Sequence, residues 1–133
     1  MSIEDRISYS HKIRVEKRDL DSLNHVNNVV YLQWVNDISE RHWNLLASEE
    51  LRKKYFWVVL RHEIDYMNQA VLGDEIEVVT WVGDSKGVRS VRHVEMYLNE
   101  KPLIKASSTW CLIDAQTLRP TRIREDVLGL LTP

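Results

Sequence analysis

The stretch that decides the fold of this chain is Arg18-Asp-Leu-Asp-Ser-Leu-Asn-His-Val-Asn-Asn-Val-Val-Tyr-Leu-Gln-Trp34, a polar segment that runs directly into an apolar helical pattern. The polar part combines the carboxylates of Asp19 and Asp21 with the imidazole of His25. A carboxylate and a histidine just before a helix N-terminus suit acyl transfer. Free helix N–H groups stabilise an anion there, while the side chains transfer protons or attack.

The residues after this segment predict a long helix from about Asn28 to Leu46. Apolar residues recur at spacings of three, four and seven positions, which gathers them in one buried stripe. The stripe consists of Tyr31, Trp34, Val35, Ile38, Leu45 and Leu46. Asn27 or Asn28 is a suitable N-cap residue. The charged residues Glu49 to Lys54 are expected to form the helix end and a loop.

Alternating apolar and polar residues predict five strands. One strand, His11 to Lys17, precedes the polar segment, and four follow the helix: Trp57–Tyr66, Glu75–Val82, Val88–Leu98 and Leu103–Asp114. The first of these four is expected to place on one face Val58, Leu60, His62, Ile64 and Tyr66. Residues 121–131 are expected to form a short terminal helix.

This order of elements predicts an α+β fold in a single domain, residues 1–133. Consecutive strands joined by short turns favour an antiparallel meander. One helix of about 28 Å is long enough to cover one face of a five-stranded sheet. Because the edges of such a sheet are exposed unless they pair, a homodimer or homotetramer is expected.

The bulk composition argues against several classes of protein. A net charge of -2 with no basic half argues against a nucleic-acid partner. No apolar run is long enough to cross a bilayer, and the polar N-terminus is unlike a secretory signal, so no membrane partner is expected. A lone cysteine, Cys111, suits a reducing cytoplasm. No metal-ligand spacing or Gly-rich phosphate loop is present, so neither metal nor cofactor is expected.

The element order and the polar segment together resemble the hotdog fold, in which a curved antiparallel sheet wraps a central helix. The pattern Asp19-Leu-Asp21-x-x-x-His25-Val-Asn-Asn-x-x-Tyr31 is similar to the acyl-thioesterase branch of that fold. This branch includes 4-hydroxybenzoyl-CoA thioesterases and acyl-carrier-protein thioesterases. A second stretch, Ile64-Asp-Tyr66-x-x-x-Ala-x-x-Gly73-Asp74-Glu-Ile-Glu-Val, is similar to the strand and Gly-Asp turn of the same family. The resemblance implies a hydrolase of acyl-CoA or acyl-carrier-protein thioesters.

The resemblance also implies roles for individual residues. Asp21 matches the nucleophile or general base, His25 an assisting group, and the backbone N–H at Asn28 or Val29 the oxyanion hole. The carrier-protein type has an Asn where this chain has Leu23, and a Glu where it has Gln69. An amide cannot act as a general base, so these differences place more of the chemistry on Asp21. Asp19 is expected to be structural.

Further residues are expected to contact substrate. Tyr31 and Trp34 either pack in the core or line an acyl channel, and Asn24 and Gln69 belong to the two family-like stretches. Lys86 and Arg89 flank the Gly83–Gly87 turn, where they either bind phosphates of a CoA or phosphopantetheine donor or stay solvated.

Two other functions remain open at this stage. One is a hotdog module that binds an acyl thioester without hydrolysing it, which the Gln69 difference makes conceivable. The other is a dehydratase acting on hydroxyacyl thioesters, ranked last because such enzymes resemble a different motif.

Overall fold

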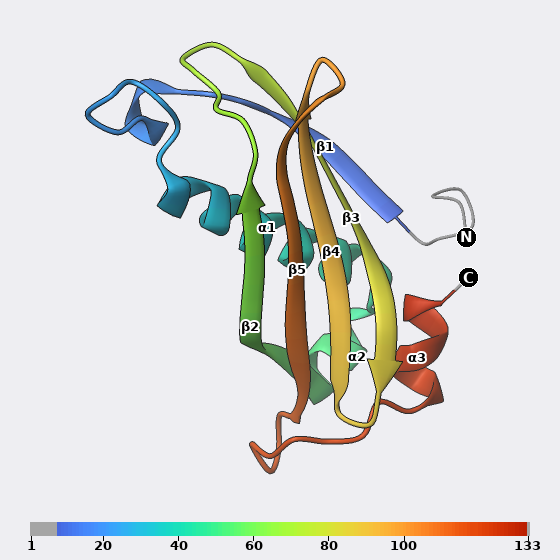
Figure 1. Cartoon of the computed structure of the whole chain (residues 1–133). Coiled ribbons are helices and arrows are strands. Elements are labelled where there is room, and N and C mark those ends of the chain that lie inside the picture. The colour runs from blue at the N-terminus through green and yellow to red at the C-terminus, as the bar shows by residue number, and fades with distance from the viewer. Residues whose placement is uncertain (1–7, 133) are drawn as a thin grey trace.

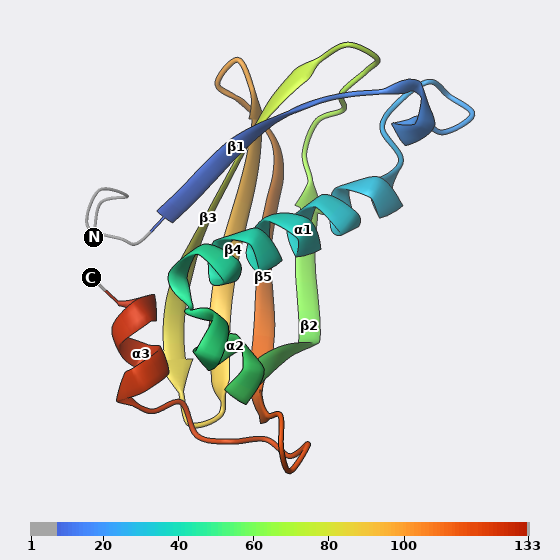
Figure 2. The same ribbon diagram turned by 180° about the vertical axis from the view of Figure 1, so that it is seen from behind.

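The computed structural model describes residues 8–132, in which a five-stranded antiparallel sheet curves around one long helix (Figure 1). The helix, α1, crosses the inner face of the sheet, and two short helices lie beside its C-terminal end (Figure 2). The elements are β1 (Ser8–Arg14), a 3-10 turn η2 (Lys17–Asp19), α1 (Asn28–Leu46), α2 (Glu49–Lys54), β2 (Tyr55–Tyr66), β3 (Glu75–Lys86), β4 (Arg89–Leu98), β5 (Lys101–Asp114) and α3 (Glu125–Leu131).

The strand order across the sheet is β1-β3-β4-β5-β2. The expected meander is therefore right for β3 to β5 and wrong for β2, which pairs with β5 at the far edge. The connection of residues 67–74 carries the chain back across the sheet. Along the way its Met67 N–H donates to Leu103 O at 2.8 Å and its Gly73 N–H to Val15 O at 3.1 Å. The order is thus set by contacts with distant strands.

Helix α1 has the predicted bounds. The side chain of Asn27 accepts the Val29 N–H at 2.9 Å and so caps the helix start. Most of the predicted stripe is buried, but Leu45 is 68% exposed, which corrects that prediction. In the last turns Trp43 is buried instead, because it packs in a second apolar cluster with residues of β2, β5 and α3.

Several predicted boundaries shift. Strand β1 ends at Arg14, because the chain then turns into η2. Residues Glu49–Lys54 form helix α2, with the Ser48 side chain capping the Leu51 N–H at 3.1 Å, where a loop was expected. The terminal helix begins only at Glu125.

The predicted face of β2 is wrong in its first half. A shift of register lies between Val59 and Arg61, which leaves Leu60 as an extra residue. A bulge of this kind reverses the side-chain alternation. Before it, Trp57 faces the helix and meets Trp43 edge to face at 5.6 Å. Val58 and Leu60 are exposed, whereas beyond the bulge His62 bonds Ser108 at 2.6 Å on the inner side.

Candidate active site

The polar segment forms a closed loop at the N-terminal end of α1. A bridge pairs Leu20 with Val26, and the Asp21 N–H donates to His25 O at 2.8 Å. Asn24 takes a left-handed backbone conformation with φ 63°, and its N–H donates to Asp21 O at 3.1 Å. Asn tolerates that conformation better than most residues, so the exposed Asn24 serves the turn here.

The Asp21 carboxylate has two functions available to it. Its Oδ1 accepts the N–H of Leu23 at 2.9 Å and the N–H of His25 at 3.2 Å, which holds the loop closed. Its Oδ2 has no hydrogen-bond partner among residues 8–132. The side chain is half-buried. One oxygen therefore positions the carboxylate, and the other remains available to attack a carbonyl carbon or to deprotonate water.

His25 is half-buried in the same loop. Its Nδ1 is buried without a hydrogen-bond partner in the described part of the chain. The loop thus holds His25 through its backbone and leaves the imidazole uncommitted, which is compatible with an assisting role.

The start of α1 narrows the candidate oxyanion hole to Asn28. The Val29 N–H is taken by the Asn27 side chain, and the N–H groups of Val30 and Tyr31 point to Asn27 O at 2.9 and 3.4 Å. The Asn28 N–H is the donor of this first turn that has no partner within the described residues. In this structure the Val29 N–H is therefore engaged and the Asn28 N–H is free, while the oxyanion role itself stays a prediction.

Two neighbouring segments of the chain form hydrogen bonds at or beside the loop. Asp19 accepts the Glu16 N–H at 2.8 Å, while its carbonyl accepts the Asn27 N–H at 2.9 Å, which confirms its structural role. Gln69 is exposed and lies beside Ala70, whose carbonyl accepts the Val26 N–H at 3.0 Å. The connection 67–74 thus brings Gln69 next to the loop, as a contact with substrate requires.

Tyr31 and Trp34 belong to the core. Tyr31 is 2% exposed and Trp34 8%. The Tyr31 hydroxyl accepts the Ala70 N–H at 3.2 Å, and burial raises its pKa. Of the two alternatives for these residues, the structure favours core packing within one chain.

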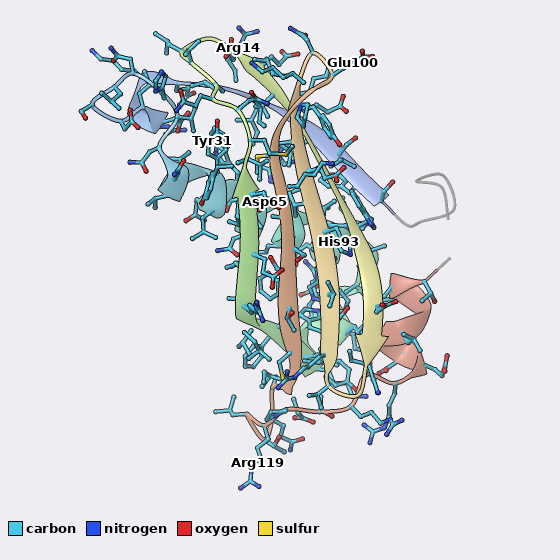
Figure 3. All side chains as sticks on the ribbon, in the orientation of Figure 1. Arg14, Tyr31, Asp65, His93, Glu100 and Arg119 are labelled. Atoms are coloured by element: carbon cyan, nitrogen blue, oxygen red, sulfur yellow. The ribbon has the colours of Figure 1, made fainter. Side chains whose placement is uncertain are left out.

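Lys86 and Arg89 lie at the opposite end of the sheet from the loop. They pair with each other at the β3–β4 hairpin, which Figure 1 shows at the bottom, whereas the polar loop is at the top. Figure 3 shows the same two ends of the sheet, with Arg14 labelled near one end and Arg119 beyond the other. Within one chain the structure does not bring Lys86 or Arg89 to Asp21, and their phosphate contact stays a prediction.

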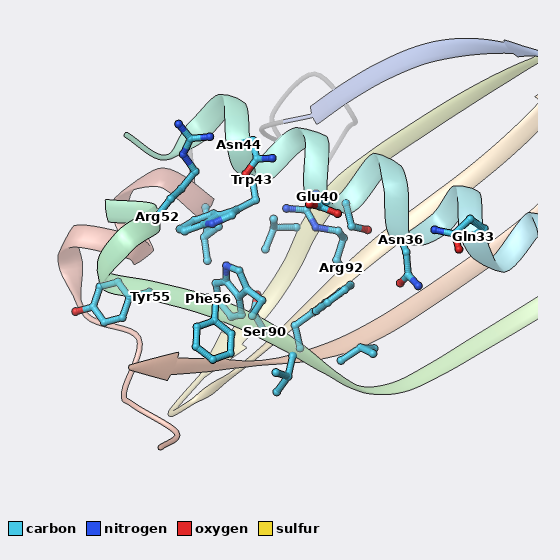
Figure 4. A pocket seen from close by; sticks show the side chains of 17 residues that line it. Gln33, Asn36, Glu40, Trp43, Asn44, Arg52, Tyr55, Phe56, Ser90 and Arg92 are labelled. Carbon is cyan, nitrogen blue, oxygen red and sulfur yellow. The ribbon is translucent and has the colours of Figure 1, made fainter. Parts of the chain in front are cut away.

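A pocket that the sequence did not predict lies farther along α1 (Figure 4). It has a volume of about 750 Å³ and is bounded by α1 from Gln33 to Asn44, by α2 and by the first part of β2. Five of its seventeen lining residues are aromatic: Trp43, Tyr55, Phe56, Trp57 and Trp110. The sequence did not reveal this pocket, because the bulge at Leu60 reverses the alternation along β2 and the predicted pattern placed Trp57 on the outer face. The high count of five tryptophans was the available signal.

One buried cation reaches this pocket. Arg92 is 6% exposed, and its Nη1 donates to His42 Nδ1 at 2.8 Å and to Thr80 Oγ1 at 3.1 Å. Burial, and then the Arg92 charge, lowers the pKa of His42 to about 4. His42 is therefore neutral at pH 7, so its Nδ1 can accept a hydrogen bond. Burial lowers the pKa of Arg92 to about 10, which leaves the guanidinium charged.

An antiparallel sheet wrapped around one helix, with an acidic loop at the start of that helix, defines a hotdog-fold domain. Solved structures share this fold. A thioesterase from Thermus thermophilus, complexed with coenzyme A and Zn, has a TM-score of 0.83 at 24% identity over 97% of this chain and 94% of that one. The 1,4-dihydroxy-2-naphthoyl-CoA thioesterase from Synechocystis has a TM-score of 0.80 at 15% identity over 93% and 95%.

Residues 6–131 match the family described as the acyl-ACP thioesterase N-terminal domain, and the chain belongs to this family. The chloroplastic palmitoyl-acyl carrier protein thioesterase of Arabidopsis thaliana is 33% identical over 89 residues, which cover 65% of this chain and 22% of the relative. The chain thus spans about a fifth of the length of the curated relatives that it matches. The resemblance seen in the polar segment is confirmed.

No cluster of three or more metal-binding side chains occurs in residues 8–132. None of the helices there is both long and apolar enough to cross a membrane.

Proposed function

We infer that this chain hydrolyses acyl thioesters of CoA or an acyl carrier protein to a free acid and a thiol. The observation that carries this proposal is the free Oδ2 of Asp21 in a loop that ends at the unpaired Asn28 N–H. Membership of the acyl-ACP thioesterase family supports it. The matched relatives act on carrier-protein thioesters by name, and a similar structure holds coenzyme A, so both donors are proposed.

The reaction needs an anion site, an attacking oxygen and a proton route. The Asn28 N–H is proposed to hold the thioester oxygen as it becomes negative. One such donor contributes about 3 kcal/mol to transition-state stabilisation in enzymes where it has been removed. Asp21 Oδ2 either attacks the carbonyl carbon to give an anhydride, or removes a proton from the water that attacks. The C–S bond then breaks, and His25 is proposed to assist protonation of the departing thiolate.

In the direct route, water cleaves the anhydride and frees Asp21 as a carboxylate. In the water route, the acid leaves directly and the Asp21 proton returns to solvent. Both routes consume one water for each acid and thiol formed. No metal or cofactor is needed for either.

The test is release of thiol by the purified chain from a panel of acyl-CoA and acyl-carrier-protein thioesters. Asp21→Asn keeps an Oδ1 that accepts both loop N–H groups and removes only the charge. We expect it to lower the rate at least about 100-fold, as for loss of a general base. An unchanged rate would show that Asp21 does not carry the reaction.

A module that binds acyl thioesters without hydrolysing them is the alternative that one observation favours. Gln69, which stands where the carrier-protein type has Glu, lies beside the loop and cannot accept a proton as a base. Tight binding of an acyl thioester with no thiol released under any condition would select this alternative.

The same proposal includes a homodimer formed through β2. This edge strand exposes an apolar row, with side chains 37–50% exposed at Phe56, Val58, Val59 and Leu60. Exposed apolar edge strands commonly pair with a second chain. Val58→Lys should shift the mass measured by light scattering toward the monomer. A reducing cytoplasm is proposed for the location, since Cys111 is buried and free.

A further inference from the structure

The buried guanidinium of Arg92 is only partly satisfied by the protein. A guanidinium has five N–H donors. His42 and Thr80 take the two on Nη1. The three donors on Nε and Nη2 have no hydrogen-bond partner in the described part of the chain. They are not among its side-chain atoms that are buried without a partner, so they reach solvent and are open to a ligand. No carboxylate in residues 8–132 forms an ion pair with Arg92, so an anionic group could take that place.

The wall around Arg92 has the character of a small-molecule site. Nine of its seventeen residues are aromatic or aliphatic and eight are polar or charged, and Trp43 packs edge to face on Trp57. Two further polar atoms in this wall are buried without partners, Asn36 Oδ1 and Trp110 Nε1. An apolar pocket of about 750 Å³ with a few convergent polar groups is typical of ligand sites. The complementary ligand has an apolar body and an anionic end.

The pocket lies farther along α1 than the candidate active site. Its lining begins on α1 at Gln33, five residues or about 8 Å beyond Asn28. It then continues along the same helix as far as Asn44. The proposal below requires that a thioester whose carbonyl oxygen meets the Asn28 N–H directs its acyl chain along α1 into the pocket.

We propose that Arg92 is a specificity-determining residue, which selects acyl thioesters whose far end carries a carboxylate. The donors on Nε and Nη2 would bind that carboxylate as a planar fork, the geometry in which Arg binds carboxylates best. His42 and Thr80 orient the guanidinium from its other side. This inference rests on the proposed thioester substrate, but it concerns binding alone and stands apart from hydrolysis.

Glu40 is the carboxylate among the residues that line the same pocket. Its side chain is exposed and forms no ion pair with Arg92. If a ligand carboxylate reaches Arg92, the Glu40 charge opposes it. Removing that charge should therefore strengthen binding of a carboxylate-ended ligand and leave a methyl-ended ligand unaffected.

The test uses thioether analogues of phosphopantetheine, the arm that CoA and carrier proteins share. Matched pairs of equal chain length end in either a methyl group or a carboxylate, over a series of lengths. Quenching of the pocket tryptophans reports the dissociation constant. A thioether cannot be hydrolysed, so a failure of the proposed hydrolysis leaves this measurement intact. We expect the carboxylate-ended analogue to bind at least tenfold more tightly at one or more lengths.

Three variants assign the preference. Arg92→Gln should reduce the ratio of the two affinities to about one, and Glu40→Gln should raise it. Arg119→Gln, which makes the same change of charge on an exposed loop, should leave it unchanged. If Arg92→Gln does not fold, the affinities of the unmodified chain for the carboxylate-ended and methyl-ended analogues still test the proposal. Equal or weaker binding of the carboxylate-ended analogue at every length, including no detectable binding, overturns the proposal.

Discussion

The two ends of α1 carry sites of different construction. At the N-terminal end, the candidate catalytic groups come from eight consecutive residues, 21–28, held mainly by backbone hydrogen bonds. Farther along the helix, between Gln33 and Asn44, α1 contributes to the pocket, whose wall also comes from α2, all strands from β2 to β5, and α3. The reacting groups are therefore local in the sequence, whereas the groups proposed to choose the substrate are assembled by the whole fold.

Asp21→Ala should break the N-terminal site most severely. Like Asp21→Asn, it should lower thioester hydrolysis at least about 100-fold. Unlike Asp21→Asn, it also removes the acceptor of two loop N–H groups, at a cost of about 1–2 kcal/mol in the free energy of unfolding. Urea unfolding of the two variants measures the difference. Equal stabilities would show that Oδ1 does not hold the loop.

Acid should weaken the pocket end through His42. Its pKa is about 4 in the folded chain and near 6.5 when unfolded, so the unfolded chain binds the proton more readily. Stability is then complete above about pH 6.5 and falls by up to about 3 kcal/mol as the pH drops to 4. Urea unfolding at a series of pH values measures this loss.

The matched variant for this prediction is His42→Gln, whose amide oxygen can still accept from Arg92. The pKa values of His11 and His62 are also lowered by burial, so they add a loss in the same direction. The difference between the unmodified chain and His42→Gln isolates the contribution of His42. Identical pH dependence in both would contradict the assignment.

Asn27→Ala tests the helix start alone. Loss of the cap on Val29 N–H should cost about 1 kcal/mol of stability. Asn27→Asp keeps an acceptor at the same place and should retain most of that stability. Chemical unfolding distinguishes the two. A smaller loss for Asn27→Ala than for Asn27→Asp would show that the cap does not stabilise α1.

Leu45→Gln should have the smallest effect, within about 0.5 kcal/mol, because this side chain is 68% exposed. Ile38→Ala, on the same helix but fully buried, should cost about 2–5 kcal/mol. Thermal unfolding of both variants checks the correction to the predicted stripe. A large loss for Leu45→Gln would mean that Leu45 is covered in solution, for example by another chain.

The features that the sequence predicted well are those with a local cause. Helix α1 follows from a repeated apolar spacing and a capping Asn27, both readable within a few turns. The Asp21 loop closes on itself between Leu20 and Val26, so its residues stay together whatever surrounds them. Along β4 the buried side chains alternate regularly, from Ser90 and Arg92 to Val94 and Met96.

The features that were missed depend on partners distant in sequence. The bulge at Leu60 arises in the pairing of β2 with β5, and the spacing of apolar residues in β2 alone does not reveal it. The position of β2 at the sheet edge depends on the connection 67–74. This connection forms hydrogen bonds to Leu103 in β5 and to Val15, just after β1. Leu45 is exposed because the second cluster draws Trp43 inward.

By itself, the sequence determined the helix, the strands and the order of the reacting groups in the loop, because periodicity, capping and turn formation act over a few residues. Only the tertiary structure decided which strand lies at the edge, which face of β2 meets the helix, and that Arg92 lies against His42 and Thr80. Those features arise from hydrogen bonds and packing between segments up to about sixty residues apart. A linear pattern contains no distance information of that kind.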